Sequence, residues 1–227
     1  MCGRTSLFAP VADLEERFGA TPDYDYRPRY NVAPGSPLAT IDAERPDAIR
    51  QRVWGLVAPW ADDPDEGPRP INARAETVSG KRFFADAFAE RRCLVVVDGY
   101  YEWRERRGQN QPYRVHLPGD APFALAGLWR RWEGESRDLD TVTVVTCEAA
   151  PPVADVHDRM PVLLSREAES TWLDGPADAA ADCLEPWTDE LRAEPVSTLV
   201  NDPGNDSPAV LEPVEPPEQT DLDSFGG

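Results

Sequence analysis

The chain has 227 residues, enough for one well-buried domain, and its 41% hydrophobic residues and seven tryptophans can supply a core. No apolar run reaches the roughly 20 residues of a membrane span, no signal-peptide pattern begins the chain, and four scattered cysteines with two histidines argue against structural zinc or a disulfide framework. The 42 acidic residues against 23 basic ones, of which only Lys81 is a lysine, are typical of a halophile and argue against nucleic-acid binding on net charge alone.

The first half of the chain predicts two helices and few strands. A helix fits residues 11–18, and the Pro- and Tyr-rich stretch 21–37 is typical of an ordered, irregular loop. A strand fits residues 52–57, and the acidic segment 61–70 indicates an exposed loop. A second helix over residues 83–91 is predicted because its phenylalanines fall on one helical face.

The second half is mostly β up to residue 147 and helical after it. A buried strand is predicted over 93–97 and ends at Asp98-Gly99. Further strands are predicted at 113–117, 123–129 and 141–147. Two helices are expected, at 166–173 behind Ser165 as N-cap and at about 177–191. The chain as a whole therefore predicts an α+β fold.

Charge and composition suggest the domain limits. Most of the excess acid lies after residue 150, and residues 212–227 are so rich in Pro, Glu, Asp and Gly that they predict a disordered tail behind a single domain at 1–211. Residues 69–114 carry a net positive charge made almost entirely by arginine. In an acidic protein, such a stretch is where a phosphate backbone could bind.

Cys2 is the most reactive feature of the chain. Removal of Met1 would leave an α-amine and a thiol on adjacent carbons of the same residue, which is a 1,2-aminothiol. A free α-amine titrates near about 7.7–8.0 and a thiol near about 8.5, so a fraction of each is nucleophilic at neutral pH. Such a pair traps an aldehyde as an imine and then as a five-membered thiazolidine. Alternatively, a cysteine beside the start codon is incidental.

Three other motifs hold candidate functional residues. Glu102 follows a buried strand among aromatic residues, which would desolvate its carboxylate, although a salt bridge to Arg104 is the simpler alternative. His157 lies in a proline-bounded loop and suits proton transfer, or is an ordinary surface residue. Asn72 and Arg74 would share one face of a strand, as a hydrogen-bonding group and a phosphate ligand or as part of a salt-bridged face.

Taken together, the motifs resemble the SRAP family, the SOS response-associated peptidase domain that shields abasic sites in single-stranded DNA. The resemblance covers nearly the whole chain and rests on MCGR at 1–4, YNVAPG at 30–35, WGLVAPW at 54–60, INARAET at 71–77, RCLVVVDGYYEW at 92–103, ALAGLW at 124–129, HDRMPV at 157–162 and PVSTLVN at 195–201. It implies one compact α+β domain with a β-barrel-like core, peripheral helices and a positively charged groove.

The resemblance also implies roles for individual residues. Cys2 would be the nucleophile, with Glu102 handling the amine proton, His157 acting as acid and base at the sugar oxygen, and Asn72 bonded to the adduct. The residues that would bind DNA are Arg4, Asn31, Trp60, Arg74 and Arg82, with Trp60 stacking on a base. The product would be a thiazolidine crosslink to an abasic site, and the implied protein is a monomer without cofactor or metal.

Further expectations and two alternatives accompany this interpretation. The family name implies peptidase activity, including removal of Met1, and an abasic-site lyase activity is compatible with the same site. We expect a cytoplasmic protein that joins the nucleoid when bound to DNA during the DNA damage response, and no membrane contact. The alternatives are an amidohydrolase with an N-terminal nucleophile, because glutamine amidotransferases also begin Met-Cys-Gly, and a single-stranded DNA binder in which Cys2 is incidental.

Overall fold

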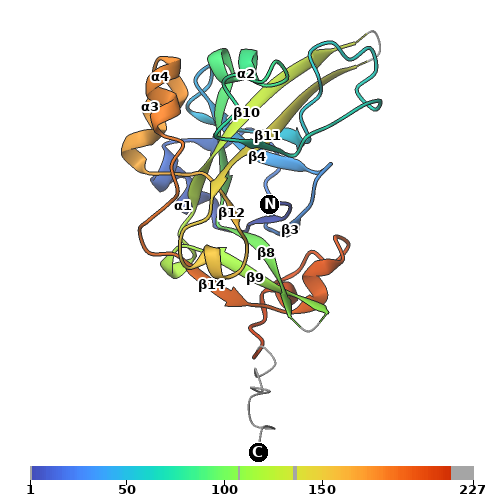
Figure 1. The fold of residues 1–227 in the computed structure, drawn as a ribbon, viewed down its shortest axis with the longest axis vertical. Coiled ribbons are helices and arrows are strands. Elements are labelled where there is room, and N and C mark those ends of the chain that lie inside the picture. Colours follow the sequence, from blue (N-terminus) through green and yellow to red (C-terminus); the bar gives the residue numbers. More distant parts are fainter. Residues whose placement is uncertain (1, 107, 135–136, 216–227) are drawn as a thin grey trace, which may run out of the picture.

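A closed β-barrel forms the core of the computed structural model, which describes residues 2–106, 108–134 and 137–215. Antiparallel neighbours follow the order β11-β10-β7-β4-β5, and β5 then pairs in parallel with β11, which closes the ring (Figure 1). These strands are β4 (Pro37–Asp42), β5 (Ala48–Trp54), β7 (Arg92–Val97), β10 (Phe123–Glu133) and β11 (Asp138–Glu148). Closure leaves these five strands without a free edge in the ring.

The barrel is filled by its most apolar strands. Every residue of β7 is buried, as its run of β-branched and leucine side chains predicts. Gly127 in the neighbouring β10 is required by close packing, because an added Cβ would lie 2.7 Å from Val95 Cγ2 and 2.9 Å from Cys93 Sγ. The barrel therefore depends on a position without a side chain where β10 pairs with β7.

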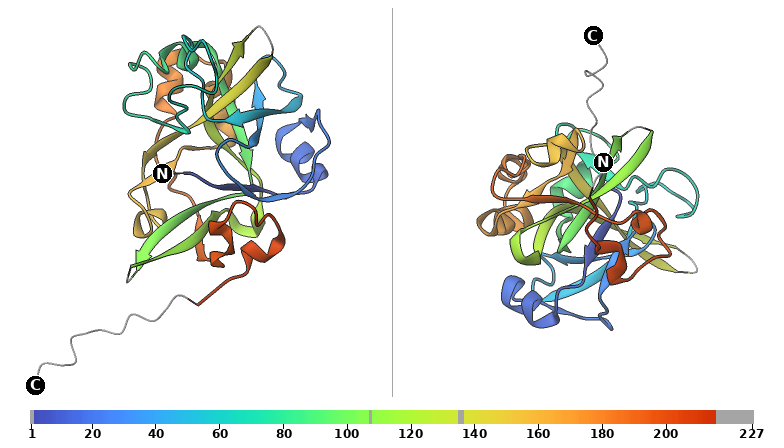
Figure 2. Two further views of the ribbon diagram at one scale, coloured as in Figure 1. Left: turned by 90° about the vertical axis from the view of Figure 1, so that its right-hand side faces the viewer. Right: turned by 90° about the horizontal axis from the view of Figure 1, so that it is seen from below.

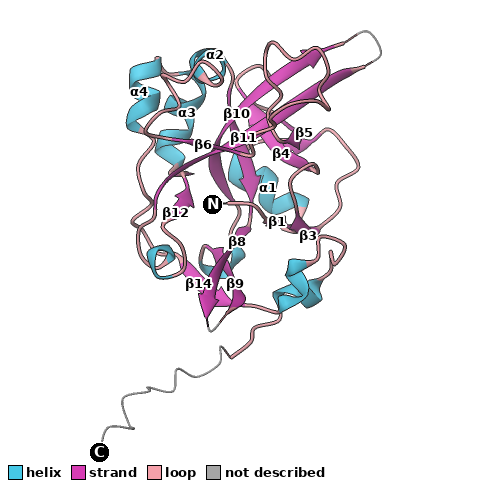
Figure 3. Cartoon of the chain, turned by 45° about the vertical axis from the view of Figure 1, so that its right-hand side comes forward, coloured by secondary structure: helices cyan, strands magenta, loops and turns pink. Residues whose placement is uncertain are grey.

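A second, five-stranded sheet packs below the barrel in the order β14-β9-β8-β1-β3. Its strands are β1 (Thr5–Leu7), β3 (Arg29–Val32), β8 (Gly99–Arg106), β9 (Gln109–His116) and β14 (Arg192–Pro195). Figures 1 and 3 show the start of β1 in the middle of the molecule, beside β8 and β12. The chain therefore enters the fold between the barrel and the second sheet.

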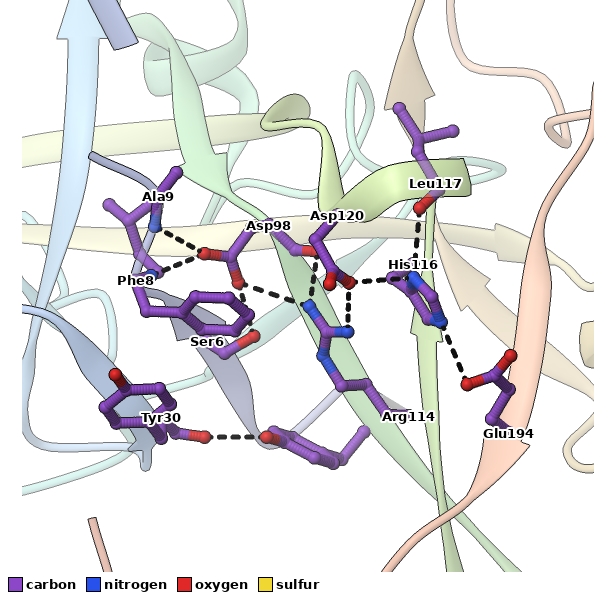
Figure 4. A network of polar contacts seen from close by, with 12 residues as sticks. Ser6, Phe8, Ala9, Tyr30, Asp98, Arg114, His116, Leu117, Asp120 and Glu194 are labelled. Atoms are coloured by element: carbon purple, nitrogen blue, oxygen red, sulfur yellow. Dashed lines mark hydrogen bonds and ion pairs between the residues drawn. The ribbon is translucent and has the colours of Figure 1, made fainter. Parts of the chain in front are cut away.

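Asp98 joins the two sheets and holds β1 in place (Figure 4). Its fully buried carboxylate accepts hydrogen bonds from the Ser6 hydroxyl at 2.6 Å and from the backbone N–H groups of Phe8 and of Ala9, the latter at 2.9 Å. Arg114 forms an ion pair with it at 3.5 Å. Burial raises the pKa of Asp98, and these partners oppose the rise. Asp98 thus fixes the strand that leads directly from Cys2.

Short helices and strands surround this core. Left-handed Gly19 (φ 64°) ends α1, and the Ser165 hydroxyl caps α3 by accepting from the Ala168 N–H. The helices are α1 (Val11–Phe18), α2 (Ala85–Glu90), α3 (Arg166–Asp174) and α4 (Ala177–Asp182). The remaining strands are β2 (Thr21–Pro22), β6 (Asn72–Arg74), β12 (Arg159–Pro161) and β13 (Leu163–Leu164). Figure 1 shows α2, α3 and α4 beside the barrel.

The last described residues pack against the second sheet (Figure 2). Val196 and Pro213 form a β-bridge, and the Val214 N–H donates to the Pro195 carbonyl at 3.0 Å. Val200 and Val210 are fully buried against Tyr101 of β8. The division into a domain at 1–211 and a tail at 212–227 stays a prediction, and residues 216–227 lie outside the described part of the chain.

The predicted fold class, one α+β domain with a barrel-like core and peripheral helices, is confirmed. The helix at 11–18, the helix behind Ser165 and the buried strand ending at Val97 lie where they were predicted. None of the helices in the described part of the chain has the length and apolar character needed to span a bilayer.

Two predictions about elements were wrong. The helix expected over 177–191 ends at Asp182, since Pro186 lies only a few residues further on and cannot continue a helix. The stretch 21–37 contains β2 and β3, whose partners are distant in sequence. Strand β8, which begins at Gly99 directly after β7 and contains Glu102, was not predicted as a separate element.

Replacing the Asp98 carboxylate tests whether its hydrogen bonds hold β1 in place. We expect Asp98→Ala to lower the free energy of unfolding by about 3–5 kcal/mol, because the change leaves Arg114 without its buried partner and frees three donors of β1 and the residues after it. Asp120→Ala is the matched control: its half-exposed carboxylate also binds Arg114, at 2.5 Å, and its loss should cost less than about 1 kcal/mol. Urea denaturation measures both, and equal losses would contradict the assignment.

Candidate active site and nucleic-acid interface

Cys2 lies at the centre of the candidate site. Its side chain is fully buried, and its backbone carbonyl accepts a hydrogen bond from Asn72 Nδ2 at 2.8 Å. This hydrogen bond joins β6 to the residues just before β1, which lie 70 residues away in sequence. Burial raises the pKa of the Cys2 thiol, and the nearby Glu102 carboxylate raises it further. The thiol is therefore protonated at neutral pH.

Glu102 is a buried acid on β8 with only 2% of its surface exposed. Burial raises its pKa to about 7, and the positive charge of the amino terminus opposes the rise. Asp158 adds a smaller upward contribution. A carboxyl group with this pKa exchanges a proton readily at neutral pH, as a general acid or base requires.

His157 follows a short 3₁₀ turn at Val153–Asp155, and about 29% of its side chain is exposed. Its Nδ1 lies 2.9 Å from the Arg159 backbone nitrogen and 2.9 Å from Asp158 Oδ1, so both neighbours orient the ring. Burial lowers the pKa of His157, and the charge of the amino terminus lowers it further, although Asp158 opposes both.

Strand β6 carries Asn72 and Arg74 beside the barrel. It pairs in parallel with β11, with Asn72 opposite Val144 and Arg74 opposite Thr146. The alternation of a strand places the two side chains on one face, while Ala73 between them is buried in the core. Asn72 thus contacts the Cys2 backbone, and Arg74 is exposed at the end of the same short strand.

Trp60 and Arg82 form a cation–π pair that is separate from the residues around Cys2. The Arg82 guanidinium lies 5.0 Å from the centroid of the Trp60 ring, and the ring meets the edge of Phe83 with centroids 5.7 Å apart. Trp60 is 53% exposed, unusual for so large an apolar side chain. An exposed indole next to an arginine offers a stacking surface for a base and a ligand for a phosphate.

Arg4 and Asn31 face the C-terminal segment. Arg4 Nη1 donates to Asn31 Oδ1 at 2.7 Å and to the Val200 carbonyl at 2.5 Å. Asn31 is only 1% exposed, and its Nδ2 donates to the carbonyls of Val200, Asp202 and Asn205. Both side chains thus position the turn after β14. Arg4 also lies 5.8 Å from the centroid of the Trp103 ring.

The exposed basic side chains without an ion pair are concentrated in one stretch. Among the described residues these are Arg74, Lys81, Arg82 and Arg166, and three of the four lie within residues 74–82. Most other arginines are neutralised by a carboxylate, for example Arg131 by Asp138. The stretch that is positive in sequence therefore keeps its charge available in the folded protein, despite the net charge of −19.

The structure groups the predicted residues in three places: Cys2, Asn72, Glu102 and His157 around the start of β1, Trp60 with Arg82, and Arg4 with Asn31. The sequence analysis missed Arg159, whose guanidinium binds Glu76 Oε1 at 2.5 Å and the Thr146 carbonyl at 2.6 Å. It is part of the quoted HDRMP motif, which was the available signal. Among residues 2–106, 108–134 and 137–215, no three His, Cys, Asp or Glu side chains form a group that could hold a metal ion.

Comparison with known proteins gives one consistent family. Residues 1–203 match the family described as SOS response associated peptidase (SRAP). "Abasic site processing protein YoqW" of Bacillus subtilis (strain 168) is 38% identical over 222 residues, which cover 93% of this chain and 99% of that protein. "Abasic site processing protein HMCES" of Gallus gallus is 30% identical over 264 residues, covering 95% of this chain and 78% of that protein.

Solved structures share the architecture. A crystal structure of a protein from Bacteroides thetaiotaomicron superposes with a TM-score of 0.84 at 23% identity, covering 94% of this chain and all of that one. A protein from Bordetella bronchiseptica superposes with a TM-score of 0.76 at 27% identity, covering 86% of this chain and all of that one. The arrangement of barrel and second sheet is therefore an established fold.

The raised pKa of Glu102 predicts a pH-dependent gain of stability on its replacement. Because the folded protein holds this proton up to a pH of about 7, against an ordinary value of 4.5, the free energy of unfolding of the parent falls as the pH rises between the two values. Glu102→Gln cannot ionise. We expect it to exceed the parent by about 1–3 kcal/mol at pH 8 and by little at pH 4.5.

Urea denaturation at both pH values measures this difference, with Glu105→Gln on the exposed face of β8 as the control that should gain nothing. A Glu102→Gln variant with the same stability difference at pH 4.5 and pH 8 would show that Glu102 is not a buried, proton-holding group.

Proposed function

The chain belongs to the SOS response associated peptidase family, and on that premise we propose that it captures abasic sites in single-stranded DNA through Cys2 after removal of Met1. The names of its relatives, which call them abasic site processing proteins, support DNA with a missing base as the substrate. The observation that carries the proposal is the burial of Cys2 beside Glu102, an acid whose pKa of about 7 suits proton transfer with an amine.

The order of the chemistry follows from the pKa of the Cys2 thiol. Since burial keeps the thiol protonated, the amine of Cys2 is the first nucleophile and attacks the open-chain aldehyde at the sugar C1′. Glu102 takes the amine proton, and water leaves as the imine forms. The sulfur then bonds to the same carbon while its proton passes to the imine nitrogen, which gives the thiazolidine without any further loss of atoms.

His157 and Asn72 complete the proposed site. The imidazole of His157 can protonate the sugar ring oxygen and help to open the ring. Asn72 fixes the Cys2 backbone at 2.8 Å and so orients the new amine. The same residues could catalyse the reverse reaction, a lyase step at the abasic site, or the removal of Met1, all of which belong to this proposal.

Binding of the DNA strand is assigned to the uncompensated cations. Arg74, at the end of the strand that starts with Asn72, would hold a phosphate beside the lesion. Trp60 and Arg82 would bind a neighbouring nucleotide by stacking and by phosphate contact. Arg4 and Asn31 would act indirectly, by positioning the C-terminal turn next to Trp103.

The two nucleophiles of Cys2 can be separated by trapping. With abasic single-stranded DNA, we expect the processed parent to form an adduct that survives denaturation without reductant. Cys2→Ala keeps the amine but lacks sulfur, so it should form an adduct only when borohydride reduces the imine. A protein with an N-terminal extension that blocks the amine should form neither adduct. Denaturing gels measure all three.

Cys183→Ala is the control for loss of a thiol elsewhere and should match the parent. A borohydride-independent adduct of Cys2→Ala at the parental rate would refute the role of the sulfur. Retardation of DNA that is lost on denaturation in every variant would instead favour a non-covalent binder.

A phosphate contact by Arg74 predicts weaker binding that is the same for every sequence, because the backbone carries no base information. In titrations of single-stranded DNA at several salt concentrations, Arg74→Ala should reduce the slope of log Kd against log salt by about 0.7, the value for one phosphate contact. Arg166→Ala removes an equally exposed and unpaired arginine at the start of α3 and should leave the slope unchanged. Equal slopes for the parent and Arg74→Ala would exclude the contact.

A further inference from the structure

Tyr100 has a buried hydroxyl group that the fold does not use. The residue is 0% exposed, and its hydroxyl oxygen has no hydrogen-bond partner among the described residues. The adjacent Tyr101 is also fully buried, but its hydroxyl donates to the Tyr30 carbonyl at 2.7 Å. A buried polar group without a partner costs stability, so an apolar ring at position 100 would serve the fold at least as well. The hydroxyl of Tyr100 therefore requires another explanation.

The position of Tyr100 connects it with the candidate site. Tyr100 lies on β8 opposite Thr5 of β1, and Thr5 follows Cys2 by three residues. The alternation of side chains along a β-strand places Tyr100 on the same face of β8 as Glu102. Cys2 and Tyr100 belong to the same buried cluster. Burial raises the pKa of Tyr100, and the charges of Cys2 and Glu102 raise it further. Tyr100 is thus within electrostatic reach of both reactive groups, and its hydroxyl keeps its proton.

A hydrogen-bond donor at this place would assist the proposed reaction. During ring closure the sulfur of Cys2 loses its proton to the imine nitrogen and carries negative charge as the bond to C1′ forms. Cys2 is buried, and burial disfavours negative charge on the sulfur. A neutral donor that is already desolvated would stabilise that charge without itself losing a proton.

We propose that the hydroxyl of Tyr100 donates a hydrogen bond to the Cys2 sulfur during thiazolidine formation and so acts as a catalytic residue of the second chemical step. This inference deepens the proposed function and rests on it. No bond to Tyr100 is made or broken. Its role is to lower the energy of the thiolate-like sulfur, and the imine step, which involves only the amine, proceeds without it.

The variant Tyr100→Phe removes only the hydroxyl. We expect the adduct that survives denaturation to form about tenfold more slowly at pH 7, while the imine trapped by borohydride forms at the parental rate. Thermal stability should be unchanged or higher, since an unpartnered buried group is removed. The matched control, Tyr101→Phe, has the opposite expectation: its melting temperature falls by a few degrees because it loses a formed hydrogen bond, and its rate of adduct formation is parental.

A second substrate separates this inference from the proposed function. Formaldehyde converts the same aminothiol to a thiazolidine without DNA, and mass spectrometry of the intact protein follows that reaction. A parent that reacts with formaldehyde but never with abasic DNA would refute the proposed function, and a tenfold slower Tyr100→Phe would still support the hydrogen bond. Parental rates of Tyr100→Phe with formaldehyde would overturn it, as would a slower reaction accompanied by a lower melting temperature, which would mark Tyr100 as merely structural.

Discussion

The pairing of β1 with β8 is the constraint on which the rest of the structure depends. It places the start of the chain between the barrel and the second sheet, opposite the strand that carries Tyr100 and Glu102. Asp98 secures this pairing from the end of β7 by binding Ser6 and the two backbone N–H groups that follow β1. A chain terminus is ordinarily mobile, so a reactive one needs such an anchor to meet its catalytic partners in a fixed geometry.

Charge is distributed so that an acidic protein keeps a basic surface. Most arginines elsewhere are paired with carboxylates, as Arg52 is with Asp42 inside the barrel, whereas residues 74–82 keep three exposed cations unpaired. Binding that relies on a few close contacts is little affected by repulsion from distant acids, because salt screens charges beyond a Debye length of about 8–10 Å. The net charge of −19 is therefore compatible with the proposed binding of a DNA strand.

The sequence patterns predicted the elements whose ends are determined by neighbouring residues in the chain. The helix at 11–18 with Gly19 after it and the helix capped by Ser165 follow from sequence patterns and caps. The second sheet could not be predicted, because β1 and β3 are short and are held by partners distant in sequence. The motifs indicated Cys2 and Glu102. That Asn31 is buried against the C-terminal segment, and that the Tyr100 hydroxyl has no partner, could not be predicted, because both depend on neighbours distant in sequence.

The central claim is that the sugar of an abasic site becomes bonded to both the nitrogen and the sulfur of Cys2. Tandem mass spectrometry of the N-terminal peptide, isolated from the protein after reaction with abasic single-stranded DNA, measures this directly. We expect a peptide that begins at Cys2, carries the deoxyribose fragment on that residue and has lost one molecule of water in the condensation. A modified peptide that still begins at Met1, or a sugar attached to any other residue, would contradict the account.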